Sequence, residues 1–181
     1  MAPKKKEHEI EEEIEDIEYV LFQGAMNGKE ANLAENARLA EAGLVPVKEL
    51  VTDALLRRAE TLRIEPKGNV ALVTFAVDGV WYPGGRLSKQ QALAVTQMLK
   101  LLAGLDIRDR KRPQNGGVRA ELSGSKYELY VESTPVAGGA ERLVVNAVDP
   151  KRVLETADDI GIPPFIRGRV RELTSRKRGI I

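Results

Sequence analysis

The densest group of chemically capable side chains lies in residues 105–117, between an expected helix and an expected strand. Four cations, Arg108, Arg110, Lys111 and Arg112, occupy residues 108–112. Guanidinium and ammonium groups attract phosphates, nucleic acids and acidic protein surfaces, so the segment predicts an anion-attracting surface. A solvated loop has the same composition, and composition alone leaves both interpretations open.

Catalytic chemistry has little support elsewhere in the sequence. The single histidine, His8, lies among acids, where a solvated side chain is expected rather than an acid–base catalyst. The absence of cysteine excludes disulfides, thiolate metal sites and cysteine nucleophiles. Gly79 and Gly84 have the separation of a phosphate-binding loop, but Gly85 and Arg86 follow in place of Lys and Ser or Thr. The sequence therefore predicts no catalytic centre.

The near-neutral formal net charge of +1 conceals two charged segments. Residues 1–18 contain three Lys and eight acids, and residues 167–178 contain six Lys or Arg and one Glu. Such blocks are typical of solvated tails or docking surfaces, and acids in a flexible run do not form a metal cage. No apolar stretch approaches the roughly 18–20 residues that cross a bilayer, and no apolar signal segment follows the first lysines. These features predict a cytoplasmic location.

The N-terminal quarter gives the weakest structural pattern. Residues 1–18 are too polar to offset the entropy of ordering, and residues 19–22 form a short apolar run expected to dock on a folded surface. Helical character over residues 31–42 is expected to stop at Gly43 and Pro46.

Two amphipathic helices are predicted in the middle of the chain. Residues 47–59 place Val47, Val51 and Leu55 on one helical face. Ser88 and Gln91 resemble a capping box that opens a second helix, which ends at Gly104. The apolar seam of this second helix is Ala92, Val95, Leu99 and Leu102.

Alternating apolar residues predict strands around these helices. The segment 71–77 and the short strand 80–82 flank Asp78-Gly79, a strong hairpin signal, and the second of these strands is expected to end at Pro83-Gly84-Gly85. Further strands are expected near 62–64, 118–122, 127–131 and 142–148, and helices near 151–160 and 164–175, the last with Ile166, Val170 and Leu173 buried. The pattern indicates an α+β fold, a mostly antiparallel sheet with flanking helices.

Several short motifs, in a fixed order, resemble the domain that precedes the ATPase core in type II secretion and type IV pilus assembly ATPases. The matching segments are Leu105-Asp106-Ile107 with Arg112 to Gly116, Arg63 to Pro66, Val77 to Val80, and Ser133-Thr134-Pro135 with Gly139 to Arg142. They resemble the family patterns LDI with R-x-P-Q-D-G, H-I-E-P, V-D-G-V, and S-T-x-P with G-E-R. Asp149 matches the end of a family L-L-D.

The resemblance implies a PAS-like α+β arrangement and a division of the chain into three parts. Residues 1–46 are a flexible acidic tail and linker, residues 47–150 are the α+β domain, and residues 151–181 are a helical linker with the start of the strand that enters the ATPase core. The chain is thus expected to stop before the Walker A motif, so ATP and Mg belong to the parent protein and no cofactor to this chain. The implied partners are an ATPase core of the same or a neighbouring subunit in a hexameric ring and inner-membrane platform proteins.

The sequence departs from the family where its domain carries arginines that reach nucleotide or a neighbouring subunit. Thr74, Ala76, Tyr130 and Asn146 occupy those positions. A neutral side chain does not stabilise developing negative charge as a guanidinium does, so the contact to ATP is expected to be weakened.

Arg112 and Arg142, with Arg110 beside them, are the remaining candidates for contacts to nucleotide or to the adjacent core. Movement through residues 151–178 is expected to couple nucleotide state to domain motion. A nucleic-acid-binding module that uses 108–112 and 167–178 is the alternative, disfavoured by the near-zero net charge and by the lack of evident stacking aromatics. A structural adaptor, docking through its acidic tail, is a third interpretation.

Overall fold

The computed structural model describes residues 18–150 and 161–175. The strands are β1 (Leu21–Ala25), β2 (Thr61–Lys67), β3 (Val70–Val77), β4 (Val80–Ser88), β5 (Gln114–Leu122), β6 (Ser125–Val136) and β7 (Ala140–Val148). The helices are α1 (Ala37–Leu56), α2 (Lys89–Leu102) and α3 (Pro164–Thr174), and the 3-10 turn η1 (Ala137–Gly139) joins β6 to β7.

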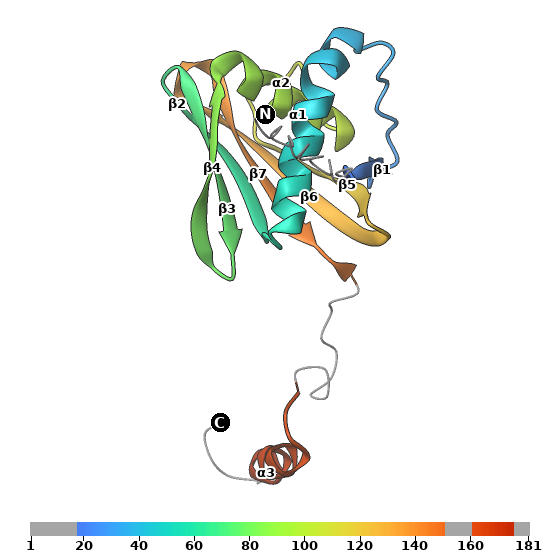
Figure 1. Cartoon of the computed structure of the whole chain (residues 1–181), viewed down its shortest axis with the longest axis vertical. Coiled ribbons are helices and arrows are strands. Elements are labelled where there is room, and N and C mark those ends of the chain that lie inside the picture. Colours follow the sequence, from blue (N-terminus) through green and yellow to red (C-terminus); the bar gives the residue numbers. More distant parts are fainter. Residues whose placement is uncertain (1–17, 151–160, 176–181) are drawn as a thin grey trace, which may run out of the picture.

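The seven strands form one antiparallel sheet in the order β1-β5-β6-β7-β2-β3-β4, and α1 and α2 lie across one of its faces (Figure 1). Alternate strand residues point at the helices and form the core with them, among them Ile64, Phe75, Leu129 and Leu143. This confirms the predicted α+β fold. The PAS-like arrangement implied by the resemblance stays a prediction.

Two local signals work as the sequence suggested. Asp78 and Gly79 have positive φ values of 50° and 76°, as the two-residue turn between β3 and β4 requires. Ser88 accepts a hydrogen bond from the Gln91 amide at 3.2 Å while the Gln91 side chain accepts from the Ser88 amide at 3.0 Å. This capping box fixes the start of α2.

The expected break near residues 43–46 is wrong, because α1 runs without interruption through both Gly43 and Pro46. Gly43 is buried against α2, and a Cβ there would lie 2.8 Å from the Ala94 carbonyl oxygen. The glycine therefore permits close packing of the two helices rather than ending one. Burial of Val47 and the residues beyond it outweighs the local helix-breaking tendency.

The folded domain also includes residues that precede residue 47, where the sequence predicted it to begin. Residues 21–25 form β1, which pairs with β5 at one edge of the sheet. Val20 is fully buried, and its amide donates to the Thr52 hydroxyl of α1 at 2.9 Å. The apolar run at 19–22 thus docks as expected, and the expectation of a flexible linker up to residue 46 does not hold for β1 or for the first half of α1.

Strand β4 does not end at Pro83-Gly84-Gly85 but continues to Ser88 through a bulge. A Cβ on Gly84 would lie 2.5 Å from the Phe75 ring, and Gly85 has a φ of +109°. The two glycines therefore let the edge strand bend over a buried aromatic ring and go on pairing.

The C-terminal helix α3 forms where residues 164–175 predicted it, but its expected apolar stripe is not buried. Ile166, Val170 and Leu173 are 41%, 53% and 48% exposed, and Figure 1 shows α3 apart from the sheet. The helix predicted for residues 151–160 lies outside the described residues. None of the described helices is long and apolar enough to cross a membrane.

Candidate functional site

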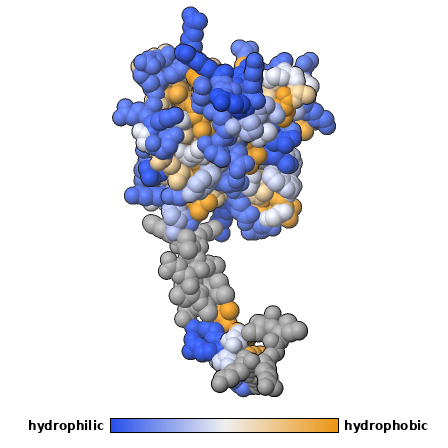
Figure 2. Space-filling model, turned by 180° about the vertical axis from the view of Figure 1, so that it is seen from behind, coloured by the Kyte–Doolittle hydropathy of each residue, from blue (hydrophilic) through white to orange (hydrophobic). Residues whose placement is uncertain are grey.

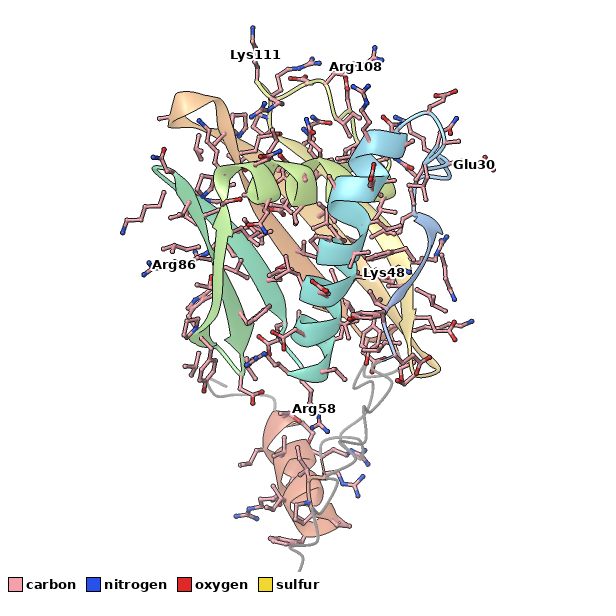
Figure 3. The ribbon with its side chains drawn as sticks, turned by 45° about the horizontal axis from the view of Figure 1, so that its top comes forward. Glu30, Lys48, Arg58, Arg86, Arg108 and Lys111 are labelled. Atoms are coloured by element: carbon pink, nitrogen blue, oxygen red, sulfur yellow. The ribbon has the colours of Figure 1, made fainter. Side chains whose placement is uncertain are left out.

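The cation-rich segment forms the loop between α2 and β5, and residues 106–113 are called the basic loop below. It lies at the end of the sheet where β5 and β7 begin and β6 ends. Figure 3 shows Arg108 and Lys111 projecting outward from this end of the molecule. The structure thus places the predicted anion-attracting side chains on an accessible edge.

Two side chains outside the loop hold its backbone. The Gln114 amide nitrogen donates to the carbonyl oxygens of Asp106 and Asp109 at 2.9 and 2.8 Å, and its oxygen accepts from the Asp106 amide at 2.9 Å. Lys100 Nζ, from α2, donates to the same Asp109 carbonyl at 2.7 Å. The loop is therefore anchored from both flanking elements.

Asp109 organises the tip of the basic loop. Its carboxylate accepts from the amides of Lys111 and Arg112 at 2.9 and 3.3 Å and from Arg112 Nε at 2.6 Å. The Lys111 amide, followed by the Arg112 guanidinium, lowers the pKa of Asp109, and Asp109 in turn raises the pKa of Arg112. The Arg112 side chain remains 82% exposed, so it faces solvent with its charge partly balanced.

Arg142, the second predicted contact, lies at the start of β7 and forms a two-pronged ion pair with Glu65 of β2. Its Nε donates to Glu65 Oε2, and its Nη2 donates to Oε1 at 2.8 Å. The hydrogen bond from Arg142 is the main cause of the lowered pKa of Glu65. Arg112 and Arg142 therefore share one end of the sheet, although no contact joins them within residues 18–150.

Arg110 points inward instead. Its guanidinium donates to the Gly139 carbonyl of η1, and its Nε lies 3.5 Å from Glu141 Oε2. Glu141 is buried and also accepts from Lys100 Nζ at 2.6 Å and from the Ser133 hydroxyl at 2.8 Å. Arg110 thus ties the basic loop to the β6–β7 connection.

The sequence analysis did not identify the pairing of Lys100 with Glu141, although both residues carried a signal. Lys100 follows Leu99 on the apolar seam of a helix, and Glu141 is in phase with the inward-facing Leu143 and Val145 of its strand. Two opposite charges, each out of place on a buried face, indicate a buried ion pair once the helix is known to cover that strand.

Arg108 and Lys111 are the cations of the basic loop for which no ion pair is found within residues 18–150 and 161–175. Arg110 and Arg112 are each paired with an acid. The anion-attracting surface is therefore smaller than the sequence implied, and the geometry does not favour the nucleic-acid alternative. In the same parts of the chain no three His, Asp or Glu side chains converge on a metal-sized site.

The four neutral residues at positions where the resemblance implied arginines lie on the sheet face turned away from the helices. Across neighbouring strands, Tyr130 is paired with Asn146, and Thr61 of β2 is paired with both Asn146 and Ala76. Thr74 lies on the same side of β3 as Ala76. Figure 2 shows this side of the molecule as mostly hydrophilic with scattered apolar residues. The substitutions thus cluster on one face rather than being dispersed.

Among the arginines on that face, Arg63 contacts an aromatic ring. Arg63 of β2 stacks on the ring of Trp81 with its guanidinium carbon 4.1 Å from the ring centroid. Its Nε is buried and has no hydrogen-bond partner. The guanidinium is therefore directed onto an aromatic ring and contributes a cation–π contact to the edge of the sheet.

Fold and site together describe a compact α+β domain that presents an anchored cationic loop. The family model described as "Type II/IV secretion system protein" matches residues 40–181, well over half of the chain. The chain belongs to this family, and the resemblance stated from its motifs is confirmed.

Several curated proteins are similar to the chain. The type IV pilus assembly ATPase PilB of Thermus thermophilus is 29% identical over 134 residues, which cover 74% of this chain and 15% of that protein. The protein transport protein HofB homolog of Escherichia coli is 31% identical over 66% of this chain and 27% of its own length. The type II secretion system protein E of Klebsiella pneumoniae is 27% identical over 75% and 27%, respectively. The chain thus spans about a quarter or less of these relatives.

Proposed function

We propose that this chain acts as a non-catalytic regulatory and assembly domain of an ATPase that drives type II secretion or type IV pilus assembly. The family match over residues 40–181 is the observation that carries this proposal. Similar proteins are named as pilus assembly ATPases and as a type II secretion system protein. ATP and Mg would be bound by the core of the parent protein, in the cytoplasm and in contact with inner-membrane platform proteins.

Within that role, Arg112 and Arg142 contact nucleotide or the adjacent core, and Arg110 holds the loop that carries Arg112. Both contact arginines are exposed at one end of the sheet, and each is oriented by a carboxylate. A guanidinium held in this way is already ordered, so docking on a phosphate or carboxylate loses less side-chain entropy. Anchoring of the basic loop by Lys100 and Gln114 acts in the same direction.

Coupling to the core would run through residues 151–178. Helix α3 lies in this segment and exposes its apolar stripe, as a helix does when its packing partner is another domain. Residues 151–160 and 176–178 lie outside the described residues. Hinge movement through this connection would let the domain and the ATPase core move relative to each other as nucleotide binds in a hexameric ring.

The test is a chimera in which this chain replaces the aligned segment of the Thermus thermophilus pilus ATPase. We expect the chimera to assemble and hydrolyse ATP, and Arg112→Gln and Arg142→Gln each to lower turnover about tenfold, the loss expected when a charged contact of about 1.4 kcal/mol is removed. Lys126→Gln, an exposed lysine on β6, is the matched control and should leave turnover unchanged.

Two results would contradict the proposal. Equal turnover in all three variants would show that neither Arg112 nor Arg142 contacts nucleotide or the core. Hydrolysis of ATP by the isolated chain would show that the domain is catalytic by itself.

A further inference from the structure

A partly enclosed cavity of about 240 Å³ lies beneath the first half of α2. Its floor and walls come from five parts of the chain: the β2–β3 turn with the start of β3, one face of α2, the basic loop, the turn η1 and the start of β7. Most of the lining is apolar, and the groups used below are Ala71, Ala92 and Leu93. The volume is that of about eight water molecules at liquid density, which is enough for a short organic chain.

The charged side chains that line the cavity are Lys89, Arg110 and Glu141. Glu141 is buried and is already compensated by Lys100 Nζ at 2.6 Å and by the Ser133 hydroxyl at 2.8 Å. Lys100, Arg110 and Glu141 together leave one positive charge unbalanced, and Lys89 adds another. The charged groups that line the cavity are therefore cationic in sum, although one of them is a carboxylate.

Arg110 and Glu141 can each form a further hydrogen bond beside the cavity. Arg110 Nε and Glu141 Oε2 are both buried without a hydrogen-bond partner. A guanidinium has five N–H donors. In Arg110, Nη2 donates to the Gly139 carbonyl, and Nε lies 3.5 Å from Glu141 Oε2. Buried donors without acceptors are costly, so an added acceptor group would be bound favourably. The start of α2, with its partial positive charge, borders the same space.

We propose that this cavity binds a small organic carboxylate, with its acid group at Arg110 and Lys89 and its apolar chain along Ala71, Ala92 and Leu93. The site is separate from the exposed arginines assigned to docking. It shares the basic loop with them through Arg110, so ligand binding would further fix the loop that presents Arg112.

The proposal is tested by amide NMR titration of the 181-residue chain at constant ionic strength. The probes are hexanoate, hexylammonium, hexan-1-ol and inorganic phosphate. We expect hexanoate to give saturable shifts, centred on the amides of Gly68, Ala92 and Gly138, with at least tenfold tighter binding than the ammonium or the alcohol. Phosphate lacks the apolar chain and should not saturate.

Two variants address the two halves of the site. Leu93→Trp fills the cavity from a half-buried position and should abolish saturable binding, while Lys89→Gln should weaken hexanoate at least fivefold. Lys126→Gln removes a lysine far from the cavity lining and should bind as the unmodified chain does. The amide spectra themselves report whether each variant is folded.

Absence of saturable hexanoate shifts would overturn the proposal. So would equal binding of hexanoate and hexylammonium, or unchanged binding by a folded Leu93→Trp variant.

Discussion

Replacement of Lys100 by Met is the sharpest test of how the basic loop is held. The side chains of Lys100 and Glu141 are 0% and 1% exposed, and their Nζ and Oε1 atoms lie 2.6 Å apart. Met keeps the length and apolar stem of the lysine but removes the charge. The carboxylate of Glu141 then keeps only the Ser133 hydroxyl at 2.8 Å and Arg110 Nε at 3.5 Å.

Removal of one partner from a buried ion pair costs about 3–5 kcal/mol, because the other charge stays buried without compensation. Arg110 is close enough to offset part of this, so we expect a loss near the lower limit, about 3 kcal/mol. That is a large share of the roughly 5–15 kcal/mol that stabilises a typical domain. Replacing both residues, as Lys100→Met with Glu141→Met, should recover at least about 2 kcal/mol, since no fully buried charge then remains and Arg110, which loses its acid, is partly exposed.

The free energy of unfolding is measured by urea denaturation, followed by circular dichroism and by the fluorescence of the single tryptophan, Trp81. Lys126→Met, at an exposed position, is the control and should lie within about 0.5 kcal/mol of the unmodified chain. Hydrogen exchange at residues 106–113 should also accelerate in Lys100→Met, because the bond to the Asp109 carbonyl is lost. A loss under about 1 kcal/mol, or a double variant as unstable as the sum of the single ones, would refute the reasoning.

Two further predictions concern packing and pH. Gly43→Ala should destabilise the chain by about 1–2 kcal/mol in urea denaturation, because the new Cβ would lie 2.8 Å from a carbonyl oxygen of α2. This cost outweighs the better helix propensity of alanine. Gly168→Ala in α3 is the control: a Cβ there meets nothing within 4 Å, so no loss of stability is expected. The pKa values of Glu65 and Asp109 are lowered in the folded chain, so their contribution to stability is complete above the ordinary carboxyl pKa of about 4 and is lost as the pH falls through the folded-state values. Unfolding measured from pH 7 to pH 3 should therefore show a decline confined to the acidic end, with a smaller decline in Glu65→Gln, and a gain in stability on acidification would contradict this.

Local patterns predicted the elements of the fold well where one physical signal dominates. Strand alternation, the turn at Asp78-Gly79 and the capping box at Ser88 each depend on neighbouring residues, and all three are confirmed. The signals at Gly43 and Gly84 misled because glycine has two uses. It ends elements where its backbone freedom is needed, and it lies inside them where another group approaches closely. Only the position of the neighbouring helix or ring distinguishes these uses.

The candidate site was also predictable from the sequence only in part. The cluster of cations at 108–112 and the family motifs around Arg112 and Arg142 are visible in the sequence. The partners of these arginines are not, because Glu65 and Arg142 are 77 residues apart and meet only through the pairing of β2 with β7.

The sequence by itself thus determined the α+β class, the family and the location of the positive charge, since each is written in local periodicity or in contiguous motifs. Tertiary structure alone decided which of those charges is available. Strand order brings Glu141 under α2, where burial forces it to pair with Lys100 and to draw Arg110 inward. Arg112 and Arg142 stay exposed because their acids, Asp109 in the basic loop and Glu65 on β2, lie near the surface rather than under α2.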